Sequence, residues 1–292
     1  MNRVRTQADA FRRAFGETSD PGAHVPRAAT EAVLARLSAW RRTDAAGSTV
    51  AALIAPPGLG KSHLLRVLES AAHPPTTDLD EDAPGALAPG RRPRSIYLPY
   101  AALGLPDLVR WIRGLAGQER DGADAALDSD RACIASLAAL SPAPDQPLEL
   151  LIDDADSMPP ATLRALAQGL DREQSPVRIV LALGDDSRAA RMLAALDALE
   201  PLELFFRDPL DTSEVEDYLE ARLARAGLGS EALDGLDGRT VSRIHALSGG
   251  FPRRIHRVVL ALVEPDRAAL ARALASSSPS DAWLGRPIDD PF

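Results

Sequence analysis

Five short, largely apolar runs lie between residues 50 and 206 of the chain. Each run is too short for a typical helix, and the segments around it are rich in polar residues, glycine or proline. Such runs are typical of strands that are buried on both faces of a parallel sheet. The five predicted strands lie at residues 50–54, 95–98, 148–152, 177–183 and 202–206.

Apolar residues recur at helical spacing between the predicted strands. In the first such segment Val33, Leu34, Leu37 and Trp40 fall on one face of a helix that begins near Thr30. Further helices are predicted at residues 63–72, 105–115, 134–140 and 161–170. Strands that alternate with helices predict the α/β fold class, with a parallel sheet sandwiched by helices.

The pattern changes at Asp211, after which no strand is predicted. Ser213 and Glu216 have the spacing of a capping box, which predicts that a helix begins there. Helices are expected at residues 214–226, 239–247 and 253–263, and together they form a small all-α lid. The predicted parts are an N-terminal segment at 1–27, the α/β domain at 28–210, the helical lid at 211–275 and a disordered tail at 276–292.

The composition is that of a globular protein with an acidic balance. Of 292 residues, 45% are hydrophobic and 26% are charged, and the net charge is -9. A chain whose main task is to wrap nucleic acid is usually basic, so this charge argues against constitutive DNA binding and leaves room only for a local basic patch. Cys133 is the only cysteine, which excludes an internal disulfide. No apolar run approaches about 18 residues and the first twenty residues have no apolar core, so we expect a cytoplasmic protein without direct membrane insertion.

A glycine-rich loop follows the first predicted strand. Residues 55–62 read Ala-Pro-Pro-Gly-Leu-Gly-Lys-Ser, and a predicted helix follows them. The phosphate-binding pattern is Gly, four residues, Gly-Lys-Ser or Thr, and Ala55 stands at its first position here. Gly58 and Gly60 allow successive backbone N–H groups to turn towards one anion. The alternative is an accidental Gly-Pro turn, but the strand before the loop and the helix after it favour phosphate binding.

The loop ends in the two side chains that carry its chemistry. Lys61 would neutralise charge between the β- and γ-phosphates, and Ser62 would supply one oxygen to Mg²⁺. The helix that follows directs its positive end at the phosphates. The predicted nucleotide-binding residues of this segment are Pro57, Gly58, Leu59, Gly60, Lys61, Ser62 and His63.

Two carboxylates follow the third predicted strand. Asp153 lies at the tip of this buried strand, where it is placed to hold Mg²⁺ through water. Asp154 comes next and would polarise the attacking water as the catalytic base. An aspartate is one methylene shorter than the glutamate that many such sites use, and Asp156 is a further carboxylate nearby. The alternative is an acidic turn after a strand.

The two motifs and the helical lid resemble the AAA+ ATPase superfamily over roughly residues 25–265. The lid stretch at residues 248–253, Ser-Gly-Gly-Phe-Pro-Arg, is similar to the A-component ATPases of the general secretion pathway and to the helper ATPases of transposition. Residues 18–27 show the same similarity. The Walker motifs at 60–65 and 152–154 look more like those of the replication-initiator group. The resemblance implies a sheet order of 5-1-4-3-2, with ATP and Mg²⁺ held between the sheet domain and the lid.

The resemblance also implies contacts outside the two motifs. Arg253, in the first turn of a lid helix that Pro252 opens, would touch the phosphates of the nucleotide. The alternative is a solvated basic helix face. The adenine would lie near Val25 and Pro26.

The chain departs from the family pattern at two positions. The polar sensor after the fourth strand falls at Asp185, and an acid beside the γ-phosphate requires a cation to offset its charge. The arginine finger expected before the fifth strand falls near 200–201, which are Glu and Pro; the nearest arginines are Arg188, Arg191 and Arg207. These departures predict slow hydrolysis or a partner that supplies the arginine.

Three functions fit these observations. The first is an ATP-dependent switch that hydrolyses ATP slowly and regulates or assembles a partner protein complex. Such a switch could also associate with further copies of itself into a homo-oligomer. The second is a DNA-associated helper in transposition, replication or repair. The third is a non-hydrolysing ATP-binding adaptor, which the departures at Asp185 and Glu200 suggest.

Two further features bear on partners. Basic residues gather at 91–94 and 253–257, and either group could meet DNA phosphates, although a solvated face or a nucleotide contact is the simpler interpretation. The chain ends in Ile-Asp-Asp-Pro-Phe, which resembles the acidic tip of bacterial single-stranded DNA-binding proteins. That resemblance predicts a docking peptide at Asp289–Phe292, and the alternative is a tail that only happens to end this way.

Overall fold

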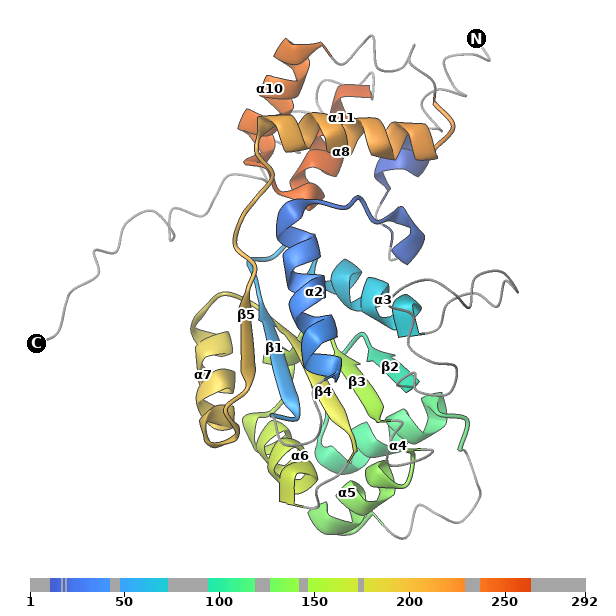
Figure 1. The fold of residues 1–292 in the computed structure, drawn as a ribbon, viewed down its shortest axis with the longest axis vertical. Helices are drawn as coiled ribbons and strands as arrows, with labels where there is room; N and C mark the ends of the chain where they lie inside the picture. The colour runs from blue at the N-terminus through green and yellow to red at the C-terminus, as the bar shows by residue number, and fades with distance from the viewer. Residues whose placement is uncertain are drawn as a thin grey trace, which may run out of the picture. The chain divides into compact units, whose positions relative to one another are not determined.

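The computed structural model contains two compact units (Figure 1). One unit spans Ser19–Asp208, and the other combines Met1–Thr18 with Pro209–Phe292. The predicted docking peptide at Asp289–Phe292 lies outside the described residues, and of the basic group at 91–94 only Arg94 lies within them. The structure describes residues 11–16, 18, 20–42, 48–72, 94–118, 127–141, 147–172, 176–228 and 237–263.

The first unit is built on a five-stranded parallel sheet. The strands follow the order β2-β3-β4-β1-β5, which confirms the predicted order counted from the opposite edge. The central strand β1 pairs with both β4 and β5, so Leu53 lies between Ala182 and Leu204. The strands are β1 (Val50–Ile54), β2 (Arg94–Leu98), β3 (Leu148–Ile152), β4 (Arg178–Leu183) and β5 (Leu202–Phe205).

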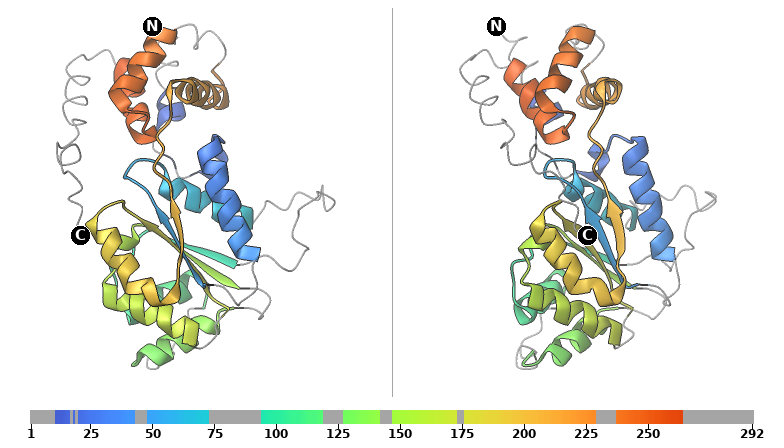
Figure 2. Two further views of the ribbon diagram at one scale, coloured as in Figure 1. Left: turned by 60° about the vertical axis from the view of Figure 1, so that its left-hand side comes forward. Right: turned by 90° about the vertical axis from the view of Figure 1, so that its left-hand side faces the viewer.

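Helices cover both faces of this sheet, as the turned views show (Figure 2). The alternate residues Val50, Ala52 and Ile54 of β1 belong to one buried cluster with residues of α4, α5, α6 and α7, because successive strand residues point to opposite faces. The helices of this unit are η1 (Pro21–Ala23), α2 (Ala28–Arg42), α3 (Lys61–Ala72), α4 (Leu105–Leu115), α5 (Asp130–Ala138), η3 (Ala155–Ser157), α6 (Pro160–Arg172), α7 (Ser187–Leu196) and η4 (Asp197–Leu199).

The helix α5 begins four residues before the predicted start at Ile134. Ser129 caps it, since its side chain accepts a hydrogen bond from the backbone N–H of Ala132 at 3.3 Å. The prediction from the apolar pattern covered the buried residues Ile134 and Leu137 but not the first turn of the helix, where Cys133 is also buried. Cys133 is fully buried in the core, as expected of a small packing residue.

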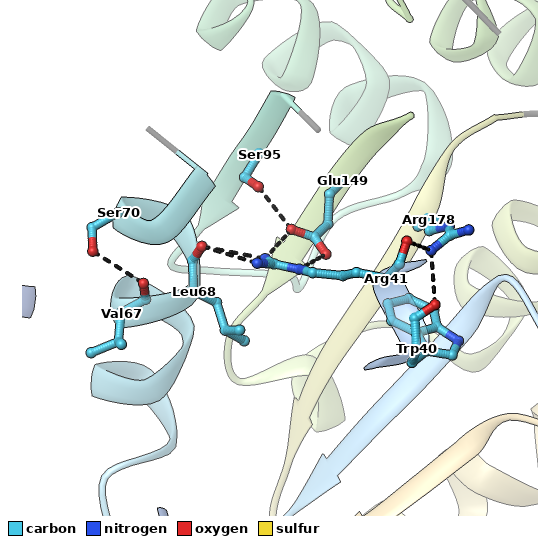
Figure 3. A network of polar contacts seen from close by, with 8 residues as sticks. All are labelled: Trp40, Arg41, Val67, Leu68, Ser70, Ser95, Glu149 and Arg178. Atoms are coloured by element: carbon cyan, nitrogen blue, oxygen red, sulfur yellow. Dashed lines mark hydrogen bonds and ion pairs between the residues drawn. The ribbon is translucent and has the colours of Figure 1, made fainter. Parts of the chain in front are cut away.

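A buried carboxylate ties the helices of one face to the sheet (Figure 3). Glu149 in β3 is only 1% exposed, and it accepts hydrogen bonds from Arg41 of α2 and from the Ser95 hydroxyl of β2 at 2.7 Å. Arg41 also donates to the carbonyl oxygen of Leu68 in α3. A buried charge is tolerated only with such partners, so this network fixes α3, which carries the phosphate loop, against β2 and β3.

The second unit is helical. It contains α8 (Thr212–Arg225), α10 (Gly238–Ser248) and α11 (Pro252–Val263). Residues 11–15 are helical as well, and Phe11 and Phe15 are buried in the same cluster as residues of all three helices. Arg222 Nε donates to the carbonyl oxygen of Ala14 at 2.7 Å, which fastens this N-terminal turn to α8. The weak periodicity of residues 1–27 gave no indication of this packing.

The capping box of the second unit differs from the predicted one. Asp211, not Ser213, caps α8: its side chain accepts from the backbone N–H of Glu214 at 2.8 Å, and the Glu214 carboxylate accepts from the backbone N–H of Asp211 at 3.1 Å. The pairs Ser213/Glu216 and Asp211/Glu214 both have the required three-residue spacing. Because the helix begins at Thr212, Asp211 is the residue at the capping position. The hydrogen bond from Glu214 lowers the pKa of Asp211, which keeps the cap ionised.

A close backbone approach accounts for part of the Gly-Gly sequence between α10 and α11. Gly250 has φ +73°, and a Cβ there would lie 2.0 Å from the carbonyl oxygen of Leu210. The backbone N–H of Leu210 donates to the carbonyl oxygen of Gly250 at 2.9 Å. Only glycine fits this contact, which joins the segment before α8 to the turn before α11.

Candidate nucleotide-binding site

The phosphate loop joins β1 to α3 in the first unit. Gly58 and Gly60 have φ values of 88° and 108°, a conformation that other residues rarely adopt. Leu59 is buried and anchors the loop, while Pro57 is exposed. Ala55 continues the strand, because its backbone N–H donates to the carbonyl oxygen of Leu183 at 3.2 Å. Its φ is not positive, so alanine serves where the common pattern has glycine.

Lys61 is the first residue of α3 and the only lysine in the sequence. Its Nζ donates to the carbonyl oxygens of Ala55 at 2.7 Å and Pro56 at 3.4 Å. Burial lowers the pKa of Lys61, and the carboxylates that follow β3 and β4 oppose this shift. The amine therefore lies among phosphate-loop groups and acidic groups. The acids that interact with it are Asp153, Asp154, Asp156 and Asp185.

Asp153 lies at the end of β3 with its carboxylate held on both sides. The backbone N–H of Asp153 still pairs with the carbonyl oxygen of Leu98 at 2.9 Å, so the residue extends the ladder with β2. Its Oδ2 accepts from the Tyr97 hydroxyl at 2.7 Å, and its Oδ1 accepts from the backbone N–H of Asp154 at 3.0 Å. Burial and the hydrogen bond to Asp153 raise the pKa of Tyr97, so this hydroxyl remains a donor at neutral pH.

Asp154 turns the chain out of the sheet in a left-handed conformation, with φ 48° and ψ 40°. Its side chain is exposed, but partial desolvation and the neighbouring Asp156 and Asp153 raise its pKa, against the effect of Lys61. A left-handed non-glycine residue at a strand end is typical of functional sites, and aspartate tolerates it better than most residues. A carboxylate with a raised pKa is better suited to accept a proton.

Gly184 makes room for the third acid. A Cβ on Gly184, directly after β4, would lie 3.0 Å from Oδ2 of Asp156. Asp156 was placed near the site by its sequence position alone, and the fold brings it against the neighbouring strand end. The carboxyl ends of β3 and β4 thus meet at one edge of the sheet, where the parallel α/β arrangement places ligand sites.

The predicted sensor acid Asp185 forms an ion pair within its own chain. Arg207, which follows β5, donates from Nε to Oδ2 at 2.7 Å and from its second nitrogen to Oδ1 at 2.8 Å. The guanidinium also lies over the Phe205 ring at 4.4 Å from its centroid. Arg207 therefore supplies the cation that the acid at this position requires, and its hydrogen bonds to Asp185 raise the pKa of the arginine. Arg188 and Arg191 are exposed on α7.

The segment predicted to contact adenine lies beside the phosphate-loop helix. The rings of His24 and His63 stack with centroids 5.5 Å apart, and His24 Nε2 lies 3.0 Å from Glu31 Oε1. His24 precedes Val25, which is half-buried, and Pro26, which is exposed. Sequence reasoning had included His63 but missed His24, because two histidines thirty-nine positions apart carry no recognisable ligand spacing.

The donor set fits a magnesium ion that is held mainly by a nucleotide. Among the described residues no group of three or more His, Cys, Asp or Glu could hold a metal by itself. Magnesium commonly takes one or two protein oxygens and completes its shell with phosphates and water. Ser62, exposed in the first turn of α3, would be one such ligand, and Asp153 would hold the ion through water.

Arg253 belongs to the second unit. It is exposed in the first turn of α11, directly after Pro252. Its contact with the phosphates of a nucleotide stays a prediction.

Within the described part of the chain, none of the helices has the length and apolar character needed to cross a membrane.

Comparisons with known proteins agree with this geometry. A family model described as an AAA domain matches residues 44–191, just over half of the chain. A structure of the Aeropyrum pernix ORC2 protein in ADPNP-ADP complexes is 17% identical, with a TM-score of 0.56, and the match covers 91% of this chain and 71% of that one. Cdc6p from Pyrobaculum aerophilum is 18% identical, with a TM-score of 0.59, and the match covers 91% of this chain and 66% of that one. At these identities the likeness shows the fold. The search of curated proteins gave no match.

Proposed function

The chain belongs to the AAA domain family, and on that basis we propose that it is an ATP-binding switch that hydrolyses ATP slowly and regulates or assembles a partner protein complex. The observation that carries the proposal is the position of the Lys61 amine. It lies in a glycine-rich loop at the start of α3 and interacts with the acids at the ends of β3 and β4. The ADPNP and ADP in the ORC2 structure support a nucleotide as the ligand here too.

Each residue of the site has a distinct part in this proposal. The backbone of the loop cradles the phosphates, and Lys61 balances their charge. Ser62 and, through water, Asp153 would hold a magnesium ion, and that ion would supply positive charge to offset the charge of the phosphates. Asp154 orients the attacking water and accepts its proton.

Two features support slow turnover. The aspartate at position 154 has a shorter reach than a glutamate. Arg207, one of the arginines near the expected finger position, is engaged by Asp185 of its own chain through two hydrogen bonds. An arginine finger raises the rate strongly where it is supplied, so a site whose arginine is engaged in this way favours a long-lived ATP state over a fast cycle.

The switch is tested by the ATP-over-ADP preference of two matched variants. The preference is measured as the dissociation constant of ADP divided by that of ATP. We expect Arg253→Ala to lower this ratio about tenfold, because a charged hydrogen bond to the γ-phosphate is lost. Arg257→Ala removes an exposed arginine one turn further along α11 and should leave the ratio unchanged. Amide hydrogen exchange at residues 252–257 in Mg-ATP and Mg-ADP provides a second measurement. Equal ratios in the two variants would argue against a lid that reads the γ-phosphate through Arg253.

The second candidate function, a DNA-associated helper, is favoured by the charge of two helices. α10 and α11 together contain five arginines and no aspartate or glutamate, in a chain whose net charge is -9. Four of these arginines are exposed, and the two helices pack against each other in one cluster. A local excess of arginine is the feature that phosphate backbones attract. The five are Arg239, Arg243, Arg253, Arg254 and Arg257.

This second function predicts a salt-dependent retention of DNA that is sensitive to α10. We expect Arg243→Gln to reduce the slope of log affinity against log salt concentration by about one and to weaken binding a few-fold. Arg225→Gln is the control, since Arg225 is an exposed arginine of α8, a helix that also carries several acids. A fluorescence anisotropy titration at several salt concentrations measures both variants. Absence of retention by the unmodified chain at low salt, with and without ATP, would exclude this function.

A further inference from the structure

Tyr97 reaches the acidic end of β3 from the edge strand of the sheet. It lies in β2, where it pairs in register with Leu151, and its hydroxyl extends two residues further to Asp153 Oδ2 at 2.7 Å. The second oxygen of the same carboxylate accepts from the backbone N–H of Asp154. With both oxygens held, rotation of the Asp153 carboxylate about its own bond is restricted.

The Tyr97 ring is itself held by the phosphate-loop helix. The Arg66 guanidinium of α3 lies 3.5 Å from the ring centroid, and Arg66 pairs with Glu69 of the same helix at 2.8 Å. α3 also begins with Lys61 and Ser62. One side chain therefore connects the helix that carries the phosphate loop to the aspartate at the end of β3.

Packing alone does not explain the hydroxyl of Tyr97. The ring lines one wall of a pocket of about 720 Å³ beside Arg66, Ile96 and Trp111, and the Tyr97 residue is only half-buried. A phenylalanine would fill this wall equally well. The hydroxyl points instead to the carboxylate, where a charged hydrogen bond is formed.

We propose that Tyr97 is a positioning residue, whose hydroxyl fixes the Asp153 carboxylate in the orientation that holds the magnesium of the bound nucleotide. The inference rests on the proposed function. Partners that orient a metal ligand commonly change metal affinity about tenfold or more when they are removed. The expected signature is therefore a change in magnesium dependence, with nucleotide binding in the absence of magnesium left intact.

The test compares Tyr97→Phe with Tyr100→Phe. Both variants lose one phenolic hydroxyl, but Tyr100 is 51% exposed and lies after β2. Binding of a fluorescent ATP analogue is titrated with Mg²⁺ and repeated in EDTA, and thermal unfolding confirms that both variants are folded. We expect Tyr97→Phe to raise the half-saturating Mg²⁺ concentration about tenfold, with no change in EDTA, and Tyr100→Phe to behave as the unmodified chain.

The outcomes separate this inference from the proposed function. If the unmodified chain binds the analogue in a magnesium-dependent way and Tyr97→Phe titrates as Tyr100→Phe does, Tyr97 has no positioning role. An equal loss of binding in EDTA would also overturn the inference, because it would indicate general damage to the site. If the unmodified chain binds no nucleotide, the proposed function and this inference fail together.

Discussion

Replacing Lys61 by alanine is expected to weaken ATP binding by about a hundredfold or more. In the proposed site the amine would donate charged hydrogen bonds to the phosphates, and such bonds each contribute about 1.5 to 3 kcal/mol. Its loss also leaves the acids at the ends of β3 and β4 without their opposing cation, so repulsion of the phosphates adds to the effect. Calorimetric titration with Mg-ATP measures the change directly.

The sequence offers a sharp control for this experiment. Arg36 is an exposed cation of α2 in the same unit, so Arg36→Ala removes the same charge away from the loop. Because Lys61 is the only lysine, acylation by an amine-reactive reagent marks the site without competition from other side-chain amines. Mg-ATP should protect Lys61 from this reaction. Binding by Lys61→Ala within threefold of Arg36→Ala would contradict the assignment of the loop.

Replacing Asp154 by asparagine is expected to lower the turnover of ATP about a hundredfold while binding is retained. The substitution keeps the shape of the side chain and removes its ability to accept a proton, which commonly contributes about 10²- to 10⁴-fold to the rate. Asparagine also tolerates the left-handed backbone that the structure has at this position. Phosphate release at saturating Mg-ATP gives the rate, and titration with a fluorescent nucleotide gives the affinity.

Asp156→Asn is the matched variant, because Asp156 lies two positions further on and interacts with both Lys61 and Asp154. Loss of turnover in Asp156→Asn with normal turnover in Asp154→Asn would transfer the role of base to Asp156. If the unmodified chain releases phosphate no faster than Asp154→Asn, the non-hydrolysing adaptor becomes the better description.

The local features of this protein are determined by the sequence itself. The run at 50–54, the glycines at 58 and 60 and the lysine after them form a strand, a turn and a helix start within a dozen residues. A short continuous apolar run and a helical spacing of apolar residues can each be recognised without knowledge of any distant part of the chain. The alternation of strands and helices along the chain predicted a parallel sheet. The order of the strands in that sheet was predicted from the family resemblance.

The pairs that complete the site come from distant parts of the chain. Tyr97 meets Asp153 because β2 lies beside β3 in the sheet, and Asp185 meets Arg207 because the segments after β4 and β5 end at the same edge. A tyrosine in a strand or an arginine in a loop has many solvated alternatives, so its sequence position does not select one partner.

The same reason applies to the buried parts that sequence patterns missed. Glu149 looks like a polar interruption in an apolar strand until Arg41 and Ser95 are brought to it. Phe11 and Phe15 have the four-residue spacing of one helix face, but a single such pair in a mixed segment does not predict a packed helix, and the cluster with α8, α10 and α11 is what buries them. The sequence by itself determined the phosphate loop, the acidic strand end and the succession of elements, since each is encoded by neighbouring residues. The tertiary structure alone decided which side chains orient and neutralise them, because register and layer packing bring together residues that have no sequence relation.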